Sequence, residues 1–382
     1  MAEFDVLVVG GGPVGAAVAL ALRGSGLAVG LLEQRAPQAA RSDPRPVALS
    51  YGSRLILERL GVWQRLQPAT AIEHIHISQR GGFGRVALDA SEAGLPALGY
   101  VVDYGKLATT LAGALDAESG CRPIRAKVIG LEGGHDEASA RYEGEAGPSH
   151  ATARLIAVAD GGGLAVAQTR TRDYRQAVVT TRVTSEAPHR NTAYERFTPE
   201  GPLALLPMGR QLALVWTTTP ARAQRLCEIG EPEFLEQLQS AFGGRLGAFR
   251  EARARAQYPL ALRAAVRAAP PRVALIGNAA QTLHPVAGQG LNLGLRDAWE
   301  LATTIRNGGP TAMGSPAQIR AYRAARRLDR AGGIGFTDAL VRLFSNDFPP
   351  LRLARGLGLA ALGAFPPARN FVVRRMTFGT RG

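Results

Sequence analysis

The sequence predicts an α/β protein in three parts: a doubly wound domain built from separate segments, an inserted domain of mostly antiparallel strands, and a helical C-terminal region. Near the N-terminus an apolar run, a glycine-rich turn, a helical pattern and a second apolar run follow one another. Between about residues 175 and 262 the pattern changes to short β-rich runs separated by Pro, Gly and polar turns. Beyond Gly290 it is helical as far as the Pro366-Pro367 break.

Each part follows from these changes of pattern. We expect one helix inside the inserted domain, around Glu233–Phe242. The strand RVALIGNAA at 272–280 returns the chain to the first domain. The expected boundaries are 1–70, 100–174 and 271–345 for the doubly wound domain, 71–99 and 175–270 for the inserted domain, and 346–382 for the C-terminal helical region.

Composition limits the class of protein. The chain has 382 residues, 46% of them hydrophobic, and a net charge of +14. Cys121 and Cys227 are too few and too far apart for a disulfide scaffold or a cysteine-based metal site, so we expect the reducing cytoplasm. Lys106 and Lys127 are the only lysines, and an arginine-rich GC-biased genome explains the charge, with anionic lipid as the alternative. Nucleic acid is not favoured, since no recognition module is present.

The first glycine motif, Gly10-Gly11-Gly12-Pro13-Val14-Gly15, fits the pattern G-x-G-x-x-G between a strand and a helix. The first glycine permits a tight turn, the second lets a pyrophosphate approach the backbone, and the third lets helix and strand pack closely. The helix N-terminus offers free N–H groups to the phosphates. Glu33 ends the next strand, where a carboxylate binds ribose hydroxyls and repels a 2′-phosphate. The motif alone fits NAD and FAD equally.

A second glycine motif extends from Leu275 to Asp297. It predicts a buried strand, a loop with Pro285, Gly288 and Gly290, and a long helix from near Asn292. Such a helix N-terminus suits the N1/C2=O edge of a reduced flavin. Proline and glycine in the loop allow backbone to lie against a flat ring.

With these motifs in view, the sequence resembles the single-component FAD-dependent aromatic hydroxylases, and among them the ubiquinone-biosynthesis ring hydroxylases. Gly10–Gly15, Ala159-Asp160-Gly161 and Gly277–Asp297 occur in that family's order, and the resemblance covers about residues 4 to 345. Further family-like stretches are Arg45–Ser50, Ile56–Trp63, Arg196–Pro207 and Tyr322-x-x-x-Arg326.

Some positions depart from the family at large. Asn278 stands where the family usually has Asp, and Gln281 stands where it often has His. This form of the motif is similar to that of the branch that acts on 2-polyprenyl-6-methoxyphenol. Leu164 and Ala167 stand where many hydroxylases have Ser and Arg, so segment 160–167 need not contact phosphate or nicotinamide as it does in them.

The resemblance implies a Rossmann-like FAD-binding domain of the aromatic-hydroxylase type and an NAD(P)H- and O2-dependent monooxygenase. Its expected reaction is hydroxylation of a polyprenylated phenol, at C1 of 2-polyprenyl-6-methoxyphenol, through a flavin C4a-hydroperoxide. The flavin performs the chemistry, so no side-chain catalyst is assigned. Two apolar strands, Leu203–Met208 and Leu212–Trp216, are expected to form the substrate wall. The alternatives are a weakly catalytic FAD-bound scaffold of a ubiquinone-biosynthesis complex and a hydroxylase of another hydrophobic aromatic.

Candidate site residues follow from the motifs and the resemblance. Pro285 and Gly290 are expected to position the flavin through their backbone, and His284 lies either beside flavin or substrate or in simple packing. Arg45 either neutralises the pyrophosphate or is a surface arginine, and Asp103 either approaches the adenosine or caps a helix. The expected cofactor-binding residues are Gly10, Gly12, Pro13, Val14, Gly15, Glu33, Gln34, Arg45, Asp103, Val128, Asp160, Asn278, Gly288, Gln289, Gly290, Leu291 and Asn292.

Three other features are interpreted as follows. His74-x-His76 resembles a metal pair but is expected to be an ordinary strand face, and no metal site is predicted. The arginines of 326–330 are expected on a solvated helix face. Residues 351–375 pair an apolar helical run with arginines, the pattern of a segment that lies on the inner membrane surface. Packing on the first domain and contact with other biosynthesis proteins are the alternatives.

Overall fold

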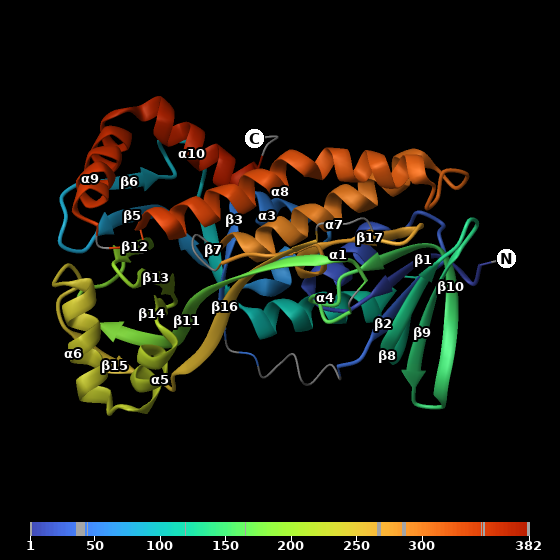
Figure 1. The fold of residues 1–382 in the computed structure, drawn as a ribbon, viewed down its shortest axis with the longest axis horizontal. Coiled ribbons are helices and arrows are strands. Elements are labelled where there is room, and N and C mark those ends of the chain that lie inside the picture. The colour runs from blue at the N-terminus through green and yellow to red at the C-terminus, as the bar shows by residue number, and fades with distance from the viewer. Residues whose placement is uncertain are drawn as a thin grey trace.

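A computed structural model of the chain describes residues 2–35, 43, 45–118, 120–164, 166–265, 269–284, 288–344, 346 and 348–379. The molecule is elongated, with a mostly parallel sheet at one end and a larger, mostly antiparallel sheet at the other (Figure 1). The long strands β11 and β16 run between the two ends. The predicted α/β fold class is confirmed.

A mixed, mostly parallel sheet forms the first end. β1 (Phe4–Val9) pairs with β2 (Val29–Glu33) on one side and with β10 (Gly147–Val158) on the other, and β10 pairs with β17 (Val273–Leu275). The parallel pairing brings the carboxyl ends of these strands to one edge, where nucleotide sites lie in such sheets. Two further strands, which were not predicted from the sequence, complete this sheet: β8 (Cys121–Gly133), which is parallel to β2, and β9 (Ala138–Gly144), which is antiparallel to both β8 and β10.

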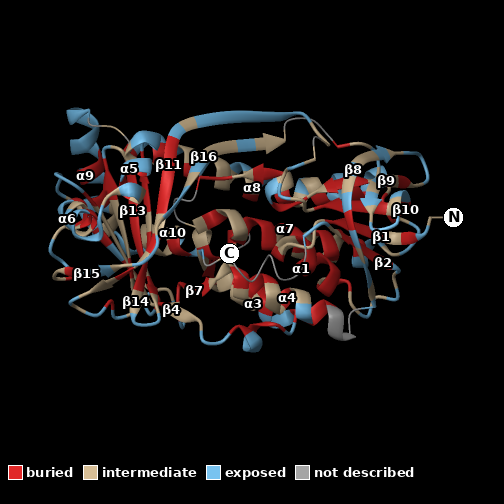
Figure 2. Cartoon of the chain, turned by 90° about the horizontal axis from the view of Figure 1, so that it is seen from below, coloured by how far each residue is buried: buried red, intermediate tan, exposed pale blue. Residues whose placement is uncertain are grey.

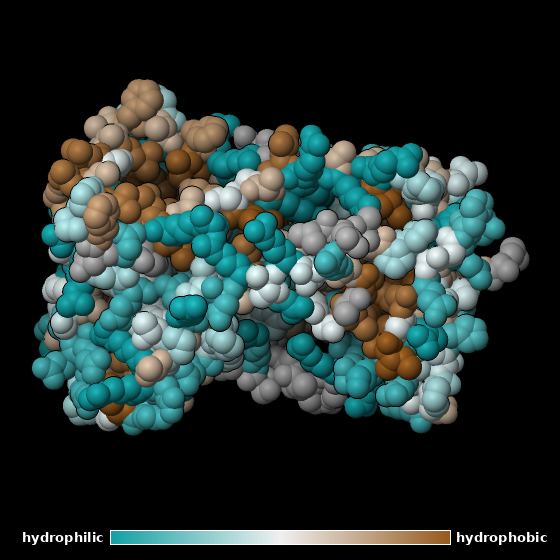
Figure 3. Space-filling view, in the orientation of Figure 1, coloured by the Kyte–Doolittle hydropathy of each residue, from teal (hydrophilic) through white to brown (hydrophobic). Residues whose placement is uncertain are grey.

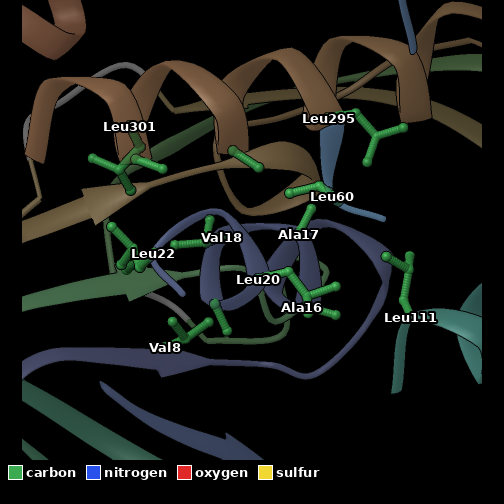
Figure 4. Close-up of a cluster of buried hydrophobic side chains, with 14 of the residues drawn as sticks. Val8, Ala16, Ala17, Val18, Leu20, Leu22, Leu60, Leu111, Leu295 and Leu301 are labelled. Carbon is green, nitrogen blue, oxygen red and sulfur yellow. The ribbon is translucent and has the colours of Figure 1, made fainter. Parts of the chain in front are cut away.

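The main hydrophobic core lies between this sheet and its helices. Ala16, Ala17 and Val18 of α1 are at most 1% exposed between Val8 of β1 and Leu295 of α7 (Figure 4). The small residues of α1 let it lie close to both neighbours. Buried residues fill α1 and α7 at the centre of the molecule, as Figure 2 shows. The helices and the 3-10 turn of this part are α1 (Pro13–Ala21), α3 (Tyr51–Arg59), η1 (Trp63–Leu66), α4 (Tyr104–Glu118) and α7 (Gln289–Gly308).

A small antiparallel sheet links the two ends. β3 (Pro46–Ser50) and β4 (Thr70–Ile72) both pair with β7 (Gly99–Asp103). The sequence analysis predicted none of these short strands, because each has too few residues to show an alternating pattern.

The large sheet forms the second end. It is antiparallel except where β12 and β5 run parallel. In sheet order its strands are β18 (Gln281–Thr282), β16 (Ala256–Ala265), β11 (Thr169–Ser185), β14 (Gln211–Thr218), β13 (Gly201–Met208), β12 (Thr192–Thr198), β5 (His74–Gln79) and β6 (Arg85–Asp89), with β15 (Phe249–Ala252) beside β11.

Two helices cover one face of this sheet. The expected helix is α6 (Glu231–Phe242), and α5 (Pro220–Glu228) precedes it, so the prediction of a single helix here is wrong. The sequence around α5 is strongly polar, which hid its narrow apolar stripe of Ala223 and Leu226.

The C-terminal region consists of helices. α8 (Pro316–Phe344) lies along α7, and α9 (Pro349–Ala364) and α10 (Pro366–Phe378) fold back over β6 and α3 (Figure 1). Leu359 of α9 and Val373 of α10 join a buried cluster with Leu88 and Phe344. Within the described residues, no helix combines the length and the apolar character that a membrane crossing needs.

Candidate active site

The first glycine turn connects β1 to α1, and its glycines differ in what surrounds them. A Cβ at Gly10, where φ is +100°, would lie 2.6 Å from the carbonyl oxygen of Ala159, and a Cβ at Gly15 would lie 1.9 Å from that of Gly10. These two glycines are therefore required by the fold itself. A Cβ at Gly12 would meet only the Tyr104 hydroxyl, at 4.0 Å. Gly12, the N-cap of α1, thus leaves open space beside the helix N-terminus, where an anion would bind.

Glu33 lies beside the same turn, at the end of β2. Its Oε2 accepts a hydrogen bond from the Gly11 N–H at 2.5 Å, and its Oε1 accepts one from the Arg35 N–H at 2.6 Å. The carboxylate is thereby held next to the glycine turn. The neighbouring Gln34 is exposed.

The second glycine motif forms a short 3-10 turn, η2 (Gly277–Ala279), and the start of α7. Helix α7 begins at Gln289, three residues before the predicted Asn292, with Gly288 as its N-cap in the left-handed conformation at φ +59°. A Cβ at Gly290 would have no atom within 4 Å. The first turn of α7 therefore presents open backbone, as predicted for contact with a flat ring. Pro285 lies outside the described residues.

Asn292 joins three segments through its side-chain amide. Its Oδ1 accepts hydrogen bonds from the Ser50 N–H at 2.8 Å and the Ser53 hydroxyl at 2.7 Å. Its Nδ2 donates to the carbonyl oxygens of Ala48 at 2.9 Å and Gly288 at 2.7 Å. Asn292, predicted to bind the cofactor, holds β3 and α3 against the start of α7 in this structure.

A buried charge cluster supports the second motif from behind. Asp297 of α7 is fully buried and accepts hydrogen bonds from the Gly277 N–H at 3.1 Å and from Gln281 at 2.9 Å. Arg326 and Arg330 of α8 form ion pairs with it at 2.7 and 3.1 Å. The prediction of a solvated arginine face is wrong for Arg326, which is 6% exposed, since an unpaired carboxylate at Asp297 would not tolerate burial.

A cavity of about 890 Å³ lies between the glycine motifs and the large sheet. One end is lined by Arg45, Tyr104, Asn278 and the residues at the start of α7, Gly288, Gly290 and Leu291. Its walls consist mostly of apolar side chains. Some of them come from the strands β4, β5, β6 and β11 to β14, and the others come from the helices α8, α9 and α10. These wall residues include Ile72, Ile75, Ile77, Leu88, Val178, Ala204, Leu206, Val215, Leu340, Phe344, Leu359, Leu362 and Met376.

Only some residues of the predicted substrate wall line the cavity. Along β13 and β14, Ala204, Leu206 and Val215 line the cavity. Leu205 and Leu214 instead belong to the core under α5 and α6. Successive strand residues point to opposite faces, and here both faces are buried, so the apolar run in the sequence did not show which half meets the cavity.

Arg45 lies at the glycine end of the cavity. Its guanidinium forms an ion pair with Asp43 at 2.6 Å and lies over the rings of Tyr104, at 5.2 Å, and Tyr258, at 5.3 Å. The hydrogen bond to Asp43 raises the pKa of Arg45. Arg45 is therefore a fixed positive charge at the end of the cavity where the sequence predicted a pyrophosphate.

Four other predicted residues lie away from the cavity lining. Asp103 accepts a hydrogen bond from Arg182 of β11, and Val128 lies within β8 opposite Tyr142. Asp160 accepts hydrogen bonds from the N–H groups of Gly162 and Leu164 and so closes its own loop.

His284 is the fourth of these residues. It is 1% exposed and packs edge-on against Tyr174 at 5.3 Å. Burial lowers the pKa of His284 to about 4, which keeps the ring neutral. The structure therefore favours the packing interpretation for this histidine.

The pair His74-x-His76 lies on β5 as expected, and His74 forms a hydrogen bond with Asp89 of β6 at 2.7 Å. In the part of the chain that the structure describes, no group of three or more metal-binding side chains comes together.

Apolar side chains are exposed on α9 and α10, next to the residues of these helices that line the cavity. Leu353, Leu357 and Phe371 are 56%, 57% and 70% exposed. Figure 3 shows hydrophobic side chains gathered at this corner of the molecule, around a hollow. Helices that line the cavity therefore also carry an apolar part of the surface.

These features fit a bound FAD. The open space at Gly12, the carboxylate of Glu33 and the charge of Arg45 suit the pyrophosphate and ribose. The open backbone at Gly290 and the neighbouring Gly288 suit the isoalloxazine ring. A bound flavin would then face the apolar part of the cavity.

Comparisons with known proteins agree with this geometry. Residues 3–331 match the model of the FAD binding domain family. The chain is 36% identical to ubiquinone hydroxylase UbiL of Rhodospirillum rubrum, over 97% of this chain and 88% of that protein. It is 32% identical to 3-demethoxyubiquinol 3-hydroxylase of Escherichia coli, over 94% of both. The structure of p-nitrophenol 4-monooxygenase PnpA from Pseudomonas putida has the same fold, with a TM-score of 0.78, 19% identity and coverage of 99% of this chain and 98% of that one. The chain therefore belongs to the FAD binding domain family and, within it, to the FAD-dependent ring hydroxylases of ubiquinone biosynthesis.

Proposed function

We propose that this protein is an NAD(P)H- and O2-dependent monooxygenase that hydroxylates a polyprenylated phenol, namely 2-polyprenyl-6-methoxyphenol at C1. The observation that carries the proposal is the apolar cavity of about 890 Å³ between the start of α7 and the exposed apolar helices α9 and α10. A cavity of this size and lining suits an aromatic head group with a hydrophobic tail. The choice of C1 rests on the form of the Gly277–Asn292 segment.

FAD would be held by the glycine turn of 10–15, Glu33 and Arg45, with its ring at Gly288 and Gly290. When bound, it supplies the redox chemistry, taking hydride from reduced nicotinamide and delivering activated oxygen to the substrate ring. The chain itself excludes water and fixes the ring. Ile75, Ile77 and Leu206 are apolar side chains of the cavity lining, and they would keep water away from the activated oxygen so that it is not lost as hydrogen peroxide.

Turnover of the purified holoprotein tests the proposal. We expect NADH or NADPH oxidation to be stimulated by 2-polyprenyl-6-methoxyphenol and to yield a product heavier by one oxygen in mass spectrometry. A scaffold subunit would retain FAD yet show no stimulated oxidation and no product. A deletion strain that accumulates a precursor already oxygenated at C1 would contradict the assigned position.

We also propose that α9 and α10 rest on an anionic membrane surface, from which the substrate enters. The exposed Leu353, Leu357 and Phe371 lie on helices that also carry Arg352 and Arg374. Apolar side chains between arginines are typical of interfacial helices, and each arginine near anionic lipid contributes roughly 1 kcal/mol. The same helices line the cavity, so a lipid-soluble substrate would pass from the membrane into the site.

A further inference from the structure

One carboxylate lies inside the apolar cavity. Glu195 is in the middle of β12, where it pairs with Ala204 of β13 and Ile77 of β5. Ala193 and Phe197, two residues to either side, line the cavity as Glu195 does. The alternation of the strand therefore directs all three side chains to the cavity face of the sheet.

Glu195 differs in its partners from Glu200, which lies in the turn between β12 and β13. Glu200 forms an ion pair with Arg222 at 2.5 Å and accepts a hydrogen bond from Thr218. Among the described residues, none donates a hydrogen bond to Glu195 or forms an ion pair with it. Glu195 is half-buried and lines the apolar cavity. An apolar site solvates a lone carboxylate poorly, so a group of the bound ligand would be the partner that this side chain lacks.

Burial raises the pKa of Glu195 to about 7, and burial is the sole cause of the shift. The other titratable side chains that line the cavity are Arg45, Tyr104, Tyr194, Tyr258 and Arg355. None of them contributes to the raised pKa of Glu195. Burial also raises the pKa of Tyr104, which keeps that phenol protonated near neutral pH. Glu195 is thus poised to exchange a proton at neutral pH.

We propose that Glu195 is a catalytic base that accepts a hydrogen bond from the aromatic hydroxyl of the substrate and removes its proton during ring hydroxylation. The inference rests on the proposed function, since it takes a phenol as the ligand. The substrate O–H bond breaks, a new O–H bond forms on the carboxylate, and the electron pair stays on the phenolate oxygen. The extra electron density makes the ring carbon a better nucleophile toward the activated oxygen. The ring regains aromaticity when the C–H bond of the hydroxylated carbon breaks and its proton passes to water, and the carboxylic acid returns its own proton to the original phenol oxygen.

Ligand binding to the holoprotein tests the contact without turnover. The probes are 2-farnesyl-6-methoxyphenol and its methyl ether, which lacks the hydroxyl. We expect wild-type protein to bind the phenol about ten-fold or more tightly than the ether at mildly alkaline pH, as a charge-assisted hydrogen bond allows. Glu195→Leu should bring this ratio to about one, and the control Glu200→Gln should leave it unchanged. An unchanged ratio in a Glu195→Leu protein that retains FAD would overturn the proposal.

The stability of the same variant separates a ligand contact from a structural role. Leucine fits an apolar cavity wall and removes an unpaired carboxylate, so Glu195→Leu should unfold in urea at the same or a higher midpoint than wild type. A lower midpoint together with an unchanged binding ratio would show that the residue serves the fold.

The pH dependence of turnover tests the base itself. The carboxylate must be ionised to accept the proton, so the wild-type hydroxylation rate should fall as the pH decreases through about 7. Glu195→Gln should be slower by about 10²-fold or more and lose this pH dependence. An unchanged rate and profile would refute the base. If the binding ratio depends on Glu195 but wild-type protein forms no oxygenated product, the contact stands and the proposed function fails.

Discussion

The Arg326 Nε donates a hydrogen bond to the Asp297 Oδ1 at 2.7 Å, and both side chains are buried. Asp297 also accepts the N–H of Gly277, so the pair fixes the turn η2 to helices α7 and α8. The arginine acts on the candidate FAD site through this aspartate, from outside the cavity lining.

Substituting Asp297→Asn should destabilise the protein by about 3–5 kcal/mol, because it leaves the buried Arg326 and Arg330 without their counter-charge. The free energy of unfolding from urea denaturation checks this. The matched control is Glu145→Gln, which removes an exposed ion pair with Arg125 and should cost less than about 1 kcal/mol. Equal effects of the two variants would show that the buried cluster adds no special stability.

The same aspartate should make stability depend on acid pH. Burial opposes ionisation of Asp297, but Arg330 and Arg326 outweigh it and hold its pKa below the ordinary 3.8. A carboxyl with a lowered folded-state pKa contributes stability that is complete above the ordinary pKa and is lost as the pH falls through the folded value. The difference in unfolding free energy between wild type and Asp297→Asn should therefore shrink below pH 3.8. A difference that stays constant into strong acid would contradict this assignment.

Two glycine substitutions should have different consequences. Gly12→Val should abolish FAD retention while the apoprotein keeps its stability, since the new side chain enters open space that the pyrophosphate would need. Gly15→Ala should reduce both FAD retention and the stability of the apoprotein, because the alanine Cβ would lie 1.9 Å from the Gly10 carbonyl oxygen. Flavin absorbance after gel filtration and thermal unfolding of the apoproteins measure the two effects. A Gly12→Val protein that is purified with a full complement of FAD would refute the predicted pyrophosphate site.

Asn292→Ala should lower stability by about 1–3 kcal/mol, because it leaves buried groups of Ser50 and Ala48 unpaired. It should also weaken FAD binding, since Gly288 and the start of α7 lose their link to β3. Titration of the apoprotein with FAD gives the affinity. The control Asn346→Ala removes hydrogen bonds at the exposed end of α8. It should change the stability and the affinity for FAD only slightly.

Membrane contact should depend on the exposed apolar residues of α9 and α10. The triple variant Leu353→Ser, Leu357→Ser and Phe371→Ser should reduce co-sedimentation with anionic liposomes and keep bound FAD. Point variants are preferable to truncation after Pro349, because Leu359 belongs to a buried cluster that truncation would remove. Leu328→Ser, at an exposed leucine of α8, is the control. Unchanged sedimentation of the triple variant would contradict the contact.

Local sequence predicted those parts of the site whose geometry is local. The turn of Gly10 to Gly15 and the approach of Glu33 depend on residues within one strand–helix–strand unit, and the structure has that unit. The roles of Asn292 and Arg326 were not predicted, because their partners lie 242 and 29 residues away along the chain. A polar residue and its distant partner leave no periodic signal that a single sequence can show.

The sequence by itself determined the family, the α/β class and the positions of the glycines, because backbone conformation and close packing restrict which residues a turn accepts. Only the tertiary structure decided which apolar residues face the cavity, since strands buried on both faces carry the same kind of side chain on each. It also decided which charges lie in the core and which line the cavity. Arg326 pairs with Asp297, whereas Glu195 lies unpaired in an apolar cavity, and burial and partners of this kind arise only when distant segments pack together.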